Sequence, residues 1–245
     1  MIHAHFHLPA SEWHGSDVEL RGEEAKHCIQ VTRHRAGDVV VLFDGAGRKA
    51  EARIEAASGG VVRLHLLDDS QIPKPRCEIT LLQALVKGDT MEWIIEKAVE
   101  LGVQRIIPVI SQRSIVRLNT AEAAKKLAKW QRVALEACKQ CGQAWLPEVV
   151  MPCSVEAACG PLEADVKLTA SLQPEARSLR AIRQGAARSA ALAIGPEGDF
   201  TEGEYAVLAA GGFQPWSLGS LILRSETAAV CALSILGYEW ASEPI

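Results

Sequence analysis

The chain has 245 residues, of which 48% are hydrophobic and 23% are charged. This composition can bury a full core and excludes a disordered protein, and the length suits one large domain or an average domain with a smaller one. No apolar run approaches the roughly 18 residues that cross a bilayer, and no secretory leader is visible, so we expect a cytoplasmic protein without a membrane partner.

The charges are unevenly distributed along the chain, although the net charge is only −4. Residues 74–143 carry 12 Lys and Arg against 7 Asp and Glu, whereas the segments on either side are acidic. A local basic face can attract a polyanion whatever the total charge, but such an excess more often marks a solvated helix face.

The seven cysteines are odd in number and scattered, which predicts reduced thiols. Cys138 and Cys141 form the one C-x-x-C pattern, within a segment, 121–142, whose apolar periodicity predicts a helix. A zinc site needs a second pair of ligands, and none has the required spacing. We therefore expect core packing here and no metal.

The first third of the chain has short strand-like patterns from Leu20 to about Asp69. Strands are predicted at 39–44, 49–56 and 61–67, and the glycines around 45–47 and 59–60 supply the positive φ of tight hairpin turns. We expect a small β-barrel or sandwich.

The pattern changes after the proline-containing segment 71–76, which predicts a linker. Strand and helix patterns then alternate, which indicates a mostly parallel sheet covered on both faces. The predicted strands are 79–86, 105–110, 167–170 and 190–194, and the predicted helices are 89–103, 121–142 and 175–184.

Two further helices are predicted near the end of the chain. Thr201 and Glu204 have the spacing of a capping box, and that helix should end by Gly211. Ser225 is expected to cap the last helix, which should run to Gly237.

Ligands of open α/β sheets bind beyond the carboxyl ends of the strands, which directs attention to two glycine-containing loops. One is IGPEGDF at 194–200 and the other is LGSLILRSETAA at 218–229. On glycine content alone, an ordinary strand-to-helix turn is the more common explanation of the first loop, and a surface ion pair explains Arg224 and Glu226 equally well. The usual nucleotide-binding fingerprints are missing.

The sequence IGPEGDFTEGE, followed by LGSLILRSETAA, resembles the RsmE family, the 16S ribosomal RNA uridine-N3 methyltransferases of the SPOUT (α/β-knot) class. LVKGDTMEWIIEKAVELGV at 85–103, QRSIVRL at 112–118 and KWQRVALEACKQCG at 129–142 agree with this family. LRGEEAKHCIQVTRHRAGDVVVLFDGAG at 20–47 is similar to its PUA-like RNA-binding domain.

The resemblance implies an α/β fold with a knotted parallel sheet that has helices on both faces. It implies a PUA-like β-barrel domain at 1–72 and a methyltransferase domain at 73–245 with a carboxyl-terminal trefoil knot. It further implies a homodimer that binds S-adenosylmethionine and methylates N3 of a uridine in 16S ribosomal RNA or the small ribosomal subunit. The implied cofactor-binding residues are Ser171, Leu172, Ile194, Gly195, Pro196, Glu197, Gly198, Leu218, Gly219, Ile222 and Leu223.

Uridine N3 becomes nucleophilic on losing its proton, so we expect a base or a nearby cation. The candidates are Arg113 and Arg224 for stabilising charge, and Glu226 for orienting an arginine or accepting the proton. The expected RNA-binding residues are Arg33, Arg35, Lys87, Arg117 and Arg132.

Some residues depart from the pattern of the RsmE family. His3, His5 and His7 alternate on one predicted strand face, as edge-strand residues or as a metal site. Gln143 stands where many relatives have arginine, and Asp199 replaces a frequent glycine.

A non-catalytic RNA-binding protein with the same fold is the first alternative function. The second is an unrelated α/β hydrolase, which the absence of any histidine after residue 65 disfavours.

Overall fold

The computed structural model describes residues 3–182 and 185–241, which divide into two compact units. The small unit comprises Met1–Lys74 together with Leu135–Leu146, and the large unit comprises Pro75–Ala134 and Pro147–Ile245. No helix in the described ranges is long and apolar enough to cross a membrane.

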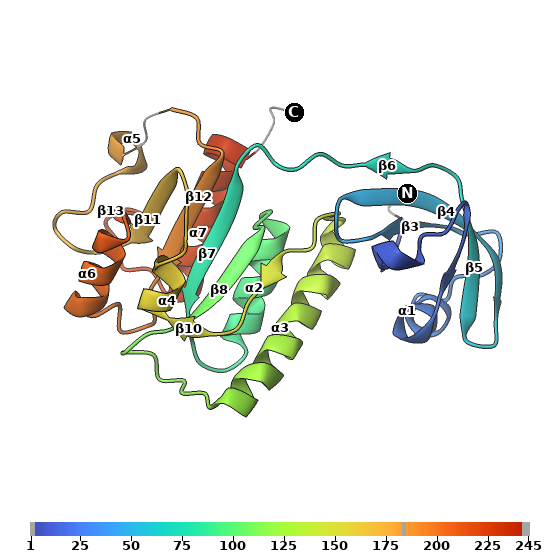
Figure 1. Ribbon diagram of the computed structural model, residues 1–245, viewed down its shortest axis with the longest axis horizontal. Helices are drawn as coiled ribbons and strands as arrows, with labels where there is room; N and C mark the ends of the chain where they lie inside the picture. Colours follow the sequence, from blue (N-terminus) through green and yellow to red (C-terminus); the bar gives the residue numbers. More distant parts are fainter. Residues whose placement is uncertain (1–2, 183–184, 242–245) are drawn as a thin grey trace. The chain divides into compact units, whose positions relative to one another are not determined.

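The small unit is built on a six-stranded sheet in the order β1-β3-β4-β5-β2, with β6 beside β4 (Figure 1). Every pairing is antiparallel except that of β1 with β3. The two predicted hairpins are confirmed, and Gly59 and Gly60 take φ values of 60° and 76° between β4 and β5. The strands are β1 His5–His7, β2 Asp17–Leu20, β3 Val39–Phe43, β4 Arg48–Ser58, β5 Val61–Leu66 and β6 Ser70–Gln71.

The small unit also contains a helical segment for which no element was predicted from the sequence. The helix α1 (Gly22–Lys26) continues into a π-helical turn, η2 (His27–Val31), and a short 3₁₀ turn, η1 (Ala10–Glu12), precedes β2. Ala25 and Cys28 are fully buried in the core. The segment is helical because it covers the apolar face of the sheet, a tertiary role that local strand-like patterns do not reveal.

Residues Leu135–Leu146 belong to the small unit because their side chains bond within it. Lys139 is 7% exposed, and its ammonium lies 2.9 Å from the Glu24 carboxylate and 3.1 Å from Nδ1 of His27. Cys138 is fully buried, and burial raises the pKa of its thiol to about 12. Core packing is therefore confirmed for Cys138, whereas Cys141 is exposed.

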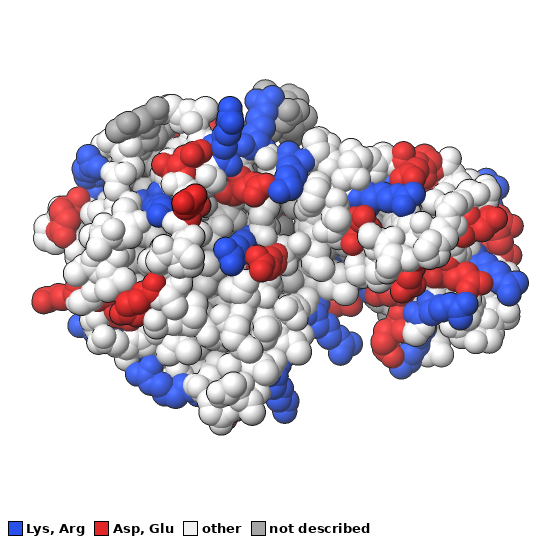
Figure 2. Space-filling model, viewed as in Figure 1, with Lys and Arg blue, Asp and Glu red and all other residues white. Residues whose placement is uncertain are grey.

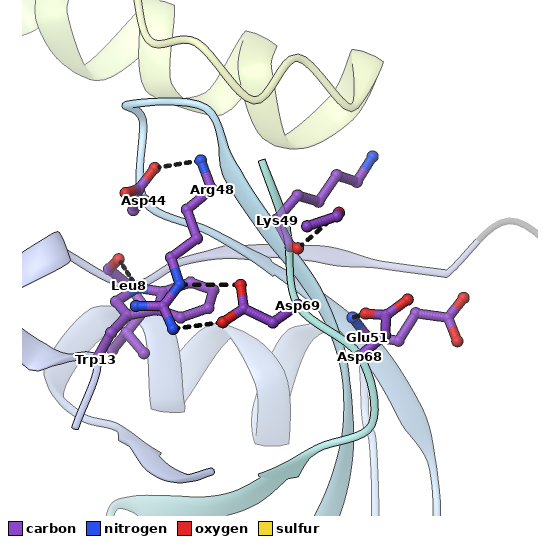
Figure 3. Close-up of polar contacts among 9 residues, drawn as sticks. Leu8, Trp13, Asp44, Arg48, Lys49, Glu51, Asp68 and Asp69 are labelled. Carbon is purple, nitrogen blue, oxygen red and sulfur yellow. Dashed lines mark hydrogen bonds and ion pairs between the residues drawn. The ribbon is translucent and has the colours of Figure 1, made fainter. Parts of the chain in front are cut away.

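An arginine joins several loops of the small unit (Figure 3). The guanidinium of Arg48 forms two hydrogen bonds to Asp69, at 3.0 and 2.6 Å, and lies 4.3 Å from the ring centre of Trp13. The indole of Trp13 donates to the carbonyl of Leu8 at 2.6 Å. Such a two-pronged bond fixes geometry more firmly than a single surface ion pair.

The large unit contains a fully parallel sheet in the order β10-β8-β7-β12-β11-β13, with β9 also beside β8. Its central strands carry long apolar runs because helices cover both faces. The strands are β7 Glu78–Ala84, β8 Arg105–Ile110, β9 Glu148–Val149, β10 Cys153–Ser154, β11 Val166–Ala170, β12 Ser189–Ile194 and β13 Gln214–Trp216.

Helices cover both faces of this sheet, as the alternating pattern predicts (Figure 1). The helices α4 (Val155–Cys159) and α6 (Glu202–Ala210) pack their apolar residues with those of the strands in one core cluster. On the other face, α2 (Thr90–Glu100) packs against α7 (Ser225–Leu236), which also contacts β12. The long helix α3 spans Thr120–Cys141, and a π-helical turn, η3 (Gly237–Ala241), follows α7.

Two helix predictions need correction and a third is confirmed. The helix expected at 175–184 is only α5, Leu179–Ile182, and residues 183 and 184 lie outside the described ranges. Ser225 is the first residue of α7 and does not cap it, because its hydroxyl bonds elsewhere and Arg224 is the N-cap. The capping box of Thr201 and Glu204 is present as predicted.

Candidate functional site

A cavity of about 500 Å³ opens at the carboxyl ends of β11 and β12. Three loops form it: the residues directly after β11, the glycine-containing loop after β12, and the segment that leads into α7. Its lining residues are Thr90, Ala170, Ser171, Leu172, Ile194, Gly195, Pro196, Glu197, Asp199, Leu218, Gly219, Leu221, Ile222, Leu223, Arg224, Ser225, Glu226 and Ala228.

The structure brings together nearly all of the residues predicted to bind a cofactor. Ser171, Leu172, the run Ile194–Glu197, Leu218, Gly219, Ile222 and Leu223 all line the cavity, and Gly198 is the one exception. The two glycine-containing loops are thus neighbours in space, although 17 residues separate them in the sequence. Gly219 has a φ of 131°, which a residue with a side chain rarely adopts.

A chain of buried hydrogen bonds joins these two loops. The hydroxyl of Ser225 donates to the carbonyl of Gly195 at 2.7 Å and accepts from the amide of Gln83 at 2.9 Å. Gln83 is completely buried on β7, and its amide also donates to the carbonyl of Ala84. The loop after β12 is therefore held to the start of α7 by the Ser225 hydroxyl, which a side chain from the neighbouring strand β7 holds in turn.

The loop after β12 ends in a left-handed residue, since Asp199 has a φ of 60°. The carboxylate of Asp199 accepts from its neighbour, the backbone N–H of Phe200, at 2.8 Å. It also accepts from the hydroxyl of Tyr205, which lies 2.8 and 3.0 Å from the two oxygens. Burial, together with the nearby Asp199, raises the pKa of Tyr205, so the hydroxyl stays protonated and remains a donor.

The three predicted catalytic residues differ in whether they line the cavity and in their hydrogen bonds. Arg113 is exposed, does not line the cavity, and donates to the carbonyls of Gly198 at 2.9 Å and Phe200 at 3.3 Å. Arg224 and Glu226 both line the cavity, and the described residues provide neither side chain with a hydrogen bond or ion pair. The ion pair between them that would explain their presence is therefore not formed.

The five predicted RNA-binding residues are all exposed. Arg33 and Arg35 lie on the small unit, and Lys87, Arg117 and Arg132 lie on the large unit. The guanidinium of Arg117 is already bonded to the carbonyls of Ser111 and Gln112, at 3.0 and 2.7 Å. On the face shown in Figure 2, acidic and basic side chains are interspersed over the small unit.

The amino-terminal histidines bond separately to the backbone. A ring nitrogen of His3 lies 3.1 Å from the carbonyl of Val39, and one of His7 lies 3.3 Å from that of Asp44. Burial, with the nearby Lys49 and His3, lowers the pKa of His5. Within residues 3–182 and 185–241, no group of three His, Cys, Asp or Glu residues is placed to hold a metal ion.

Sequence reasoning missed several residues of the cavity and its support. Ser225 and Asp199 lie inside the two recognised loops, but their roles depend on which atoms they meet. Gln83 has a visible signal, because its polar amide stands inside the apolar strand run 79–86. The other lining residues that were missed are Thr90, Ala170, Leu221 and Ala228.

Comparison with known protein families defines the class of this chain. Residues 73–237 match an RNA methyltransferase domain, and residues 20–66 match an RNA methyltransferase PUA domain. Together with the parallel sheet and the curled amino-terminal sheet, these matches define a SPOUT-type RNA methyltransferase with a PUA-like domain.

Individual relatives name the family within that class. Ribosomal RNA small subunit methyltransferase E of Bacillus subtilis is 30% identical over 231 residues, which cover 90% of this chain and 89% of the relative. The same enzyme of Synechocystis is 31% identical, with 89% of this chain and 71% of the relative covered. The chain belongs to the RsmE family of ribosomal RNA small subunit methyltransferases.

Solved structures agree over nearly the whole chain. The Neisseria gonorrhoeae ribosomal RNA small subunit methyltransferase E, bound to S-adenosylmethionine, has a TM-score of 0.87 and 34% identity, and covers 97% of this chain and 98% of that one. A methyltransferase of Legionella pneumophila in complex with the same cofactor has a TM-score of 0.90 and 30% identity, with 99% and 100% covered.

Proposed function

We propose that this chain transfers a methyl group from S-adenosylmethionine to N3 of a uridine in 16S ribosomal RNA. The observation that carries the proposal is the cavity formed by three loops at the carboxyl ends of neighbouring parallel strands. Family membership supports the class of reaction, and the two similar structures that contain S-adenosylmethionine support the choice of methyl donor.

The lining residues fit S-adenosylmethionine in size and chemistry. The cavity volume of about 500 Å³ lies within the range of small-molecule sites. Leu218, Ile222 and Leu223 provide apolar walls suited to adenine, and the backbone of Gly195 and Gly219 can approach a ligand closely. When bound, the cofactor supplies a methyl group that its sulfonium already activates, so the protein has chiefly to orient the reactants.

The remaining chemistry concerns the proton on N3 of the uridine. We assign Glu226 to accepting that proton and Arg224 to stabilising the negative charge that develops on the uracil ring. Both side chains line the cavity without partners among the described residues, so both are available to a substrate. Arg113 donates hydrogen bonds to the carbonyls of Gly198 and Phe200. We assign it to stabilising the same negative charge on the uracil ring.

The expected partners follow from this reaction. Arg33, Arg35, Lys87, Arg117 and Arg132 would contact phosphates of the RNA. We propose that the protein acts in the cytoplasm, because its substrate is ribosomal RNA. We further propose a homodimer, because Leu221 and Ile222 beside the cavity are 74% and 83% exposed and suit a covering subunit. The domain limits of 1–72 and 73–245 and the trefoil knot stay predictions of the resemblance.

Calorimetry and a methylation assay test the proposed function. S-adenosylhomocysteine should bind the purified protein, and small ribosomal subunits incubated with protein and S-adenosylmethionine should yield 3-methyluridine on nuclease digestion and mass spectrometry. The Arg224→Ala variant should retain cofactor binding and lose methylation. Tight RNA binding without cofactor affinity would instead favour the non-catalytic RNA-binding alternative.

A further inference from the structure

Asp199 holds a left-handed backbone conformation in the cavity wall, with a φ of 60°. Glycine adopts this conformation freely, whereas residues with a side chain are uncommon there, Asn and Asp least so. A carboxylate at this position is therefore present despite some backbone strain. This strain suggests that the Asp199 side chain itself has a role in the cavity.

The structure fixes the Asp199 carboxylate in place. The Phe200 N–H and the Tyr205 hydroxyl both donate to it, at distances of 2.8 to 3.0 Å. One oxygen lies 3.0 Å from the point where a Cβ on Gly195 would stand, so the carboxylate occupies the space that this glycine leaves free. It is thereby held within the loop that lines the cavity, with few rotamers available.

Asp199 forms no ion pair within the described ranges, although Arg113 donates to the carbonyls of Gly198 and Phe200 on either side of it. The donors to its carboxylate are a neutral hydroxyl and a backbone amide. The cavity lining contains three carboxylates, those of Glu197, Asp199 and Glu226, against the single cation of Arg224. An excess of negative charge in a partly enclosed site favours a positively charged ligand.

We propose that Asp199 is the residue by which the cavity distinguishes the charged methyl donor from the spent cofactor; this rests on the proposed function. S-adenosylmethionine carries a positive sulfur. Methyl transfer breaks the sulfur–methyl bond and forms an N3–methyl bond, the N3 proton leaves to a base, and the sulfur of S-adenosylhomocysteine becomes neutral. The two molecules share their adenosine, amino and carboxylate groups, so apolar walls and backbone hydrogen bonds act on both.

The field of a fixed carboxylate acts on the one feature in which the two molecules differ. It strengthens binding of the donor and not of the product, which favours exchange of spent cofactor after each turnover. Glu226 is assigned to the substrate proton, and Glu197 is exposed and accepts a hydrogen bond from the backbone N–H of Lys87. Of the three carboxylates, Asp199 is the one fixed by both a backbone donor, Phe200, and a side-chain donor, Tyr205 of α6.

The test compares the affinities of both molecules for wild-type protein and Asp199→Asn by titration calorimetry. Asparagine tolerates the left-handed conformation and has the same size, so the substitution removes the charge alone. We expect the affinity for S-adenosylmethionine to fall about five- to tenfold, as for loss of one partly solvated charge interaction, and that for S-adenosylhomocysteine to change less than about twofold.

Two further variants separate charge from other effects. Glu202→Gln removes an equal charge from an exposed position on α6 that does not line the cavity, and should leave the affinity ratio unchanged. Asp199→Gly removes the charge and relieves the backbone, and should lose selectivity as Asp199→Asn does. The inference is overturned if Asp199→Asn weakens both ligands equally or neither. Failure of the wild-type protein to bind either ligand would instead reject the proposed function.

Discussion

At the scale of single residues, the cavity depends on side chains that hold the backbone in position. Ser225 bonds the carbonyl of Gly195 and is itself bonded by Gln83, and all three lie at the carboxyl end of the sheet. Gly195 has no side chain with which to fix its own position, so the orientation of its carbonyl depends on a donor from elsewhere. The buried hydroxyl of Ser225 is the donor for this carbonyl.

Replacing Ser225 with alanine should therefore weaken both the fold and the cavity. The change leaves the carbonyl of Gly195 and one donor of Gln83 without their partner, which destabilises by roughly 1–3 kcal/mol. Urea denaturation should show this loss, and calorimetry should show weaker binding of S-adenosylhomocysteine. Ser234→Ala is the matched control, because Ser234 is exposed on the same helix and its hydroxyl bonds only the carbonyl of Val230. Equal stability of the two variants would contradict the argument.

At the scale of elements, α6 is held at its start by one carboxylate. Glu204 is 2% exposed and accepts from the backbone N–H and hydroxyl of Thr201 at 2.9 and 3.0 Å. It also accepts from the hydroxyl of Ser111 at 3.2 Å and the backbone N–H of Gln112 at 2.8 Å. The capping box thus also fastens the loop after β8 to the helix that follows the cavity loop.

Because Glu204 bonds both the helix start and the loop after β8, we expect its loss to lower the free energy of unfolding more than loss of Thr201. Thr201→Ala removes one cap and should destabilise by about 1 kcal/mol. Glu204→Ala also leaves the Ser111 hydroxyl and the Gln112 N–H without an acceptor, and should destabilise by roughly 2–4 kcal/mol. Urea denaturation followed by tryptophan fluorescence measures both, with Glu202→Gln on the same helix as a control expected within about 0.5 kcal/mol of wild type. A smaller loss for Glu204→Ala than for Thr201→Ala would show that the loop contacts are unimportant.

Elements with strong periodicity could be predicted from the sequence. The strand expected at 105–110 and the helix expected at 121–142 agree with β8 and α3 within a residue or two, because burial on both strand faces or on one helix face leaves a direct pattern. The two-residue strands β9 and β10 and the helix α1 were not predicted. Elements of two to five residues are too short for a periodic pattern and form because neighbouring elements bind them.

The candidate site was predictable in part for a related reason. Motif resemblance identifies contiguous loops, and those loops do line one cavity. Thr90 lines the cavity from α2, and Gln83 supports it from β7 through Ser225. The local sequence does not show that either residue lies near the two loops. The bonding of Arg113 to Gly198 and Phe200 is likewise set by three-dimensional packing, 85 or more residues apart.

At the scale of the whole molecule, an acidic chain is proposed to bind a polyanion. The net charge of −4 gives no general attraction to RNA, so binding must depend on particular cations that are free to meet phosphates. Ion pairs within the protein decide which cations these are. On α3, Lys129 lies 2.9 Å from the carboxylate of Glu92, whereas Arg132 is exposed and has no ion pair within the described ranges.

The dependence of RNA affinity on salt should separate these two cations. Each phosphate contact releases counterions, so loss of one contact reduces the slope of log affinity against log salt by about 1. Arg132→Ala should show that reduction in a titration of small-subunit RNA at several salt concentrations. Lys129→Ala should leave the slope nearly unchanged, because Lys129 is already paired with the carboxylate of Glu92. In that variant Glu92 still has a partner, since the ammonium of Lys126 lies 3.4 Å from the same carboxylate. Equal slopes for both variants and wild type would remove Arg132 from the RNA-binding surface, and a larger change for Lys129→Ala would show that the internal ion pair opens when RNA binds.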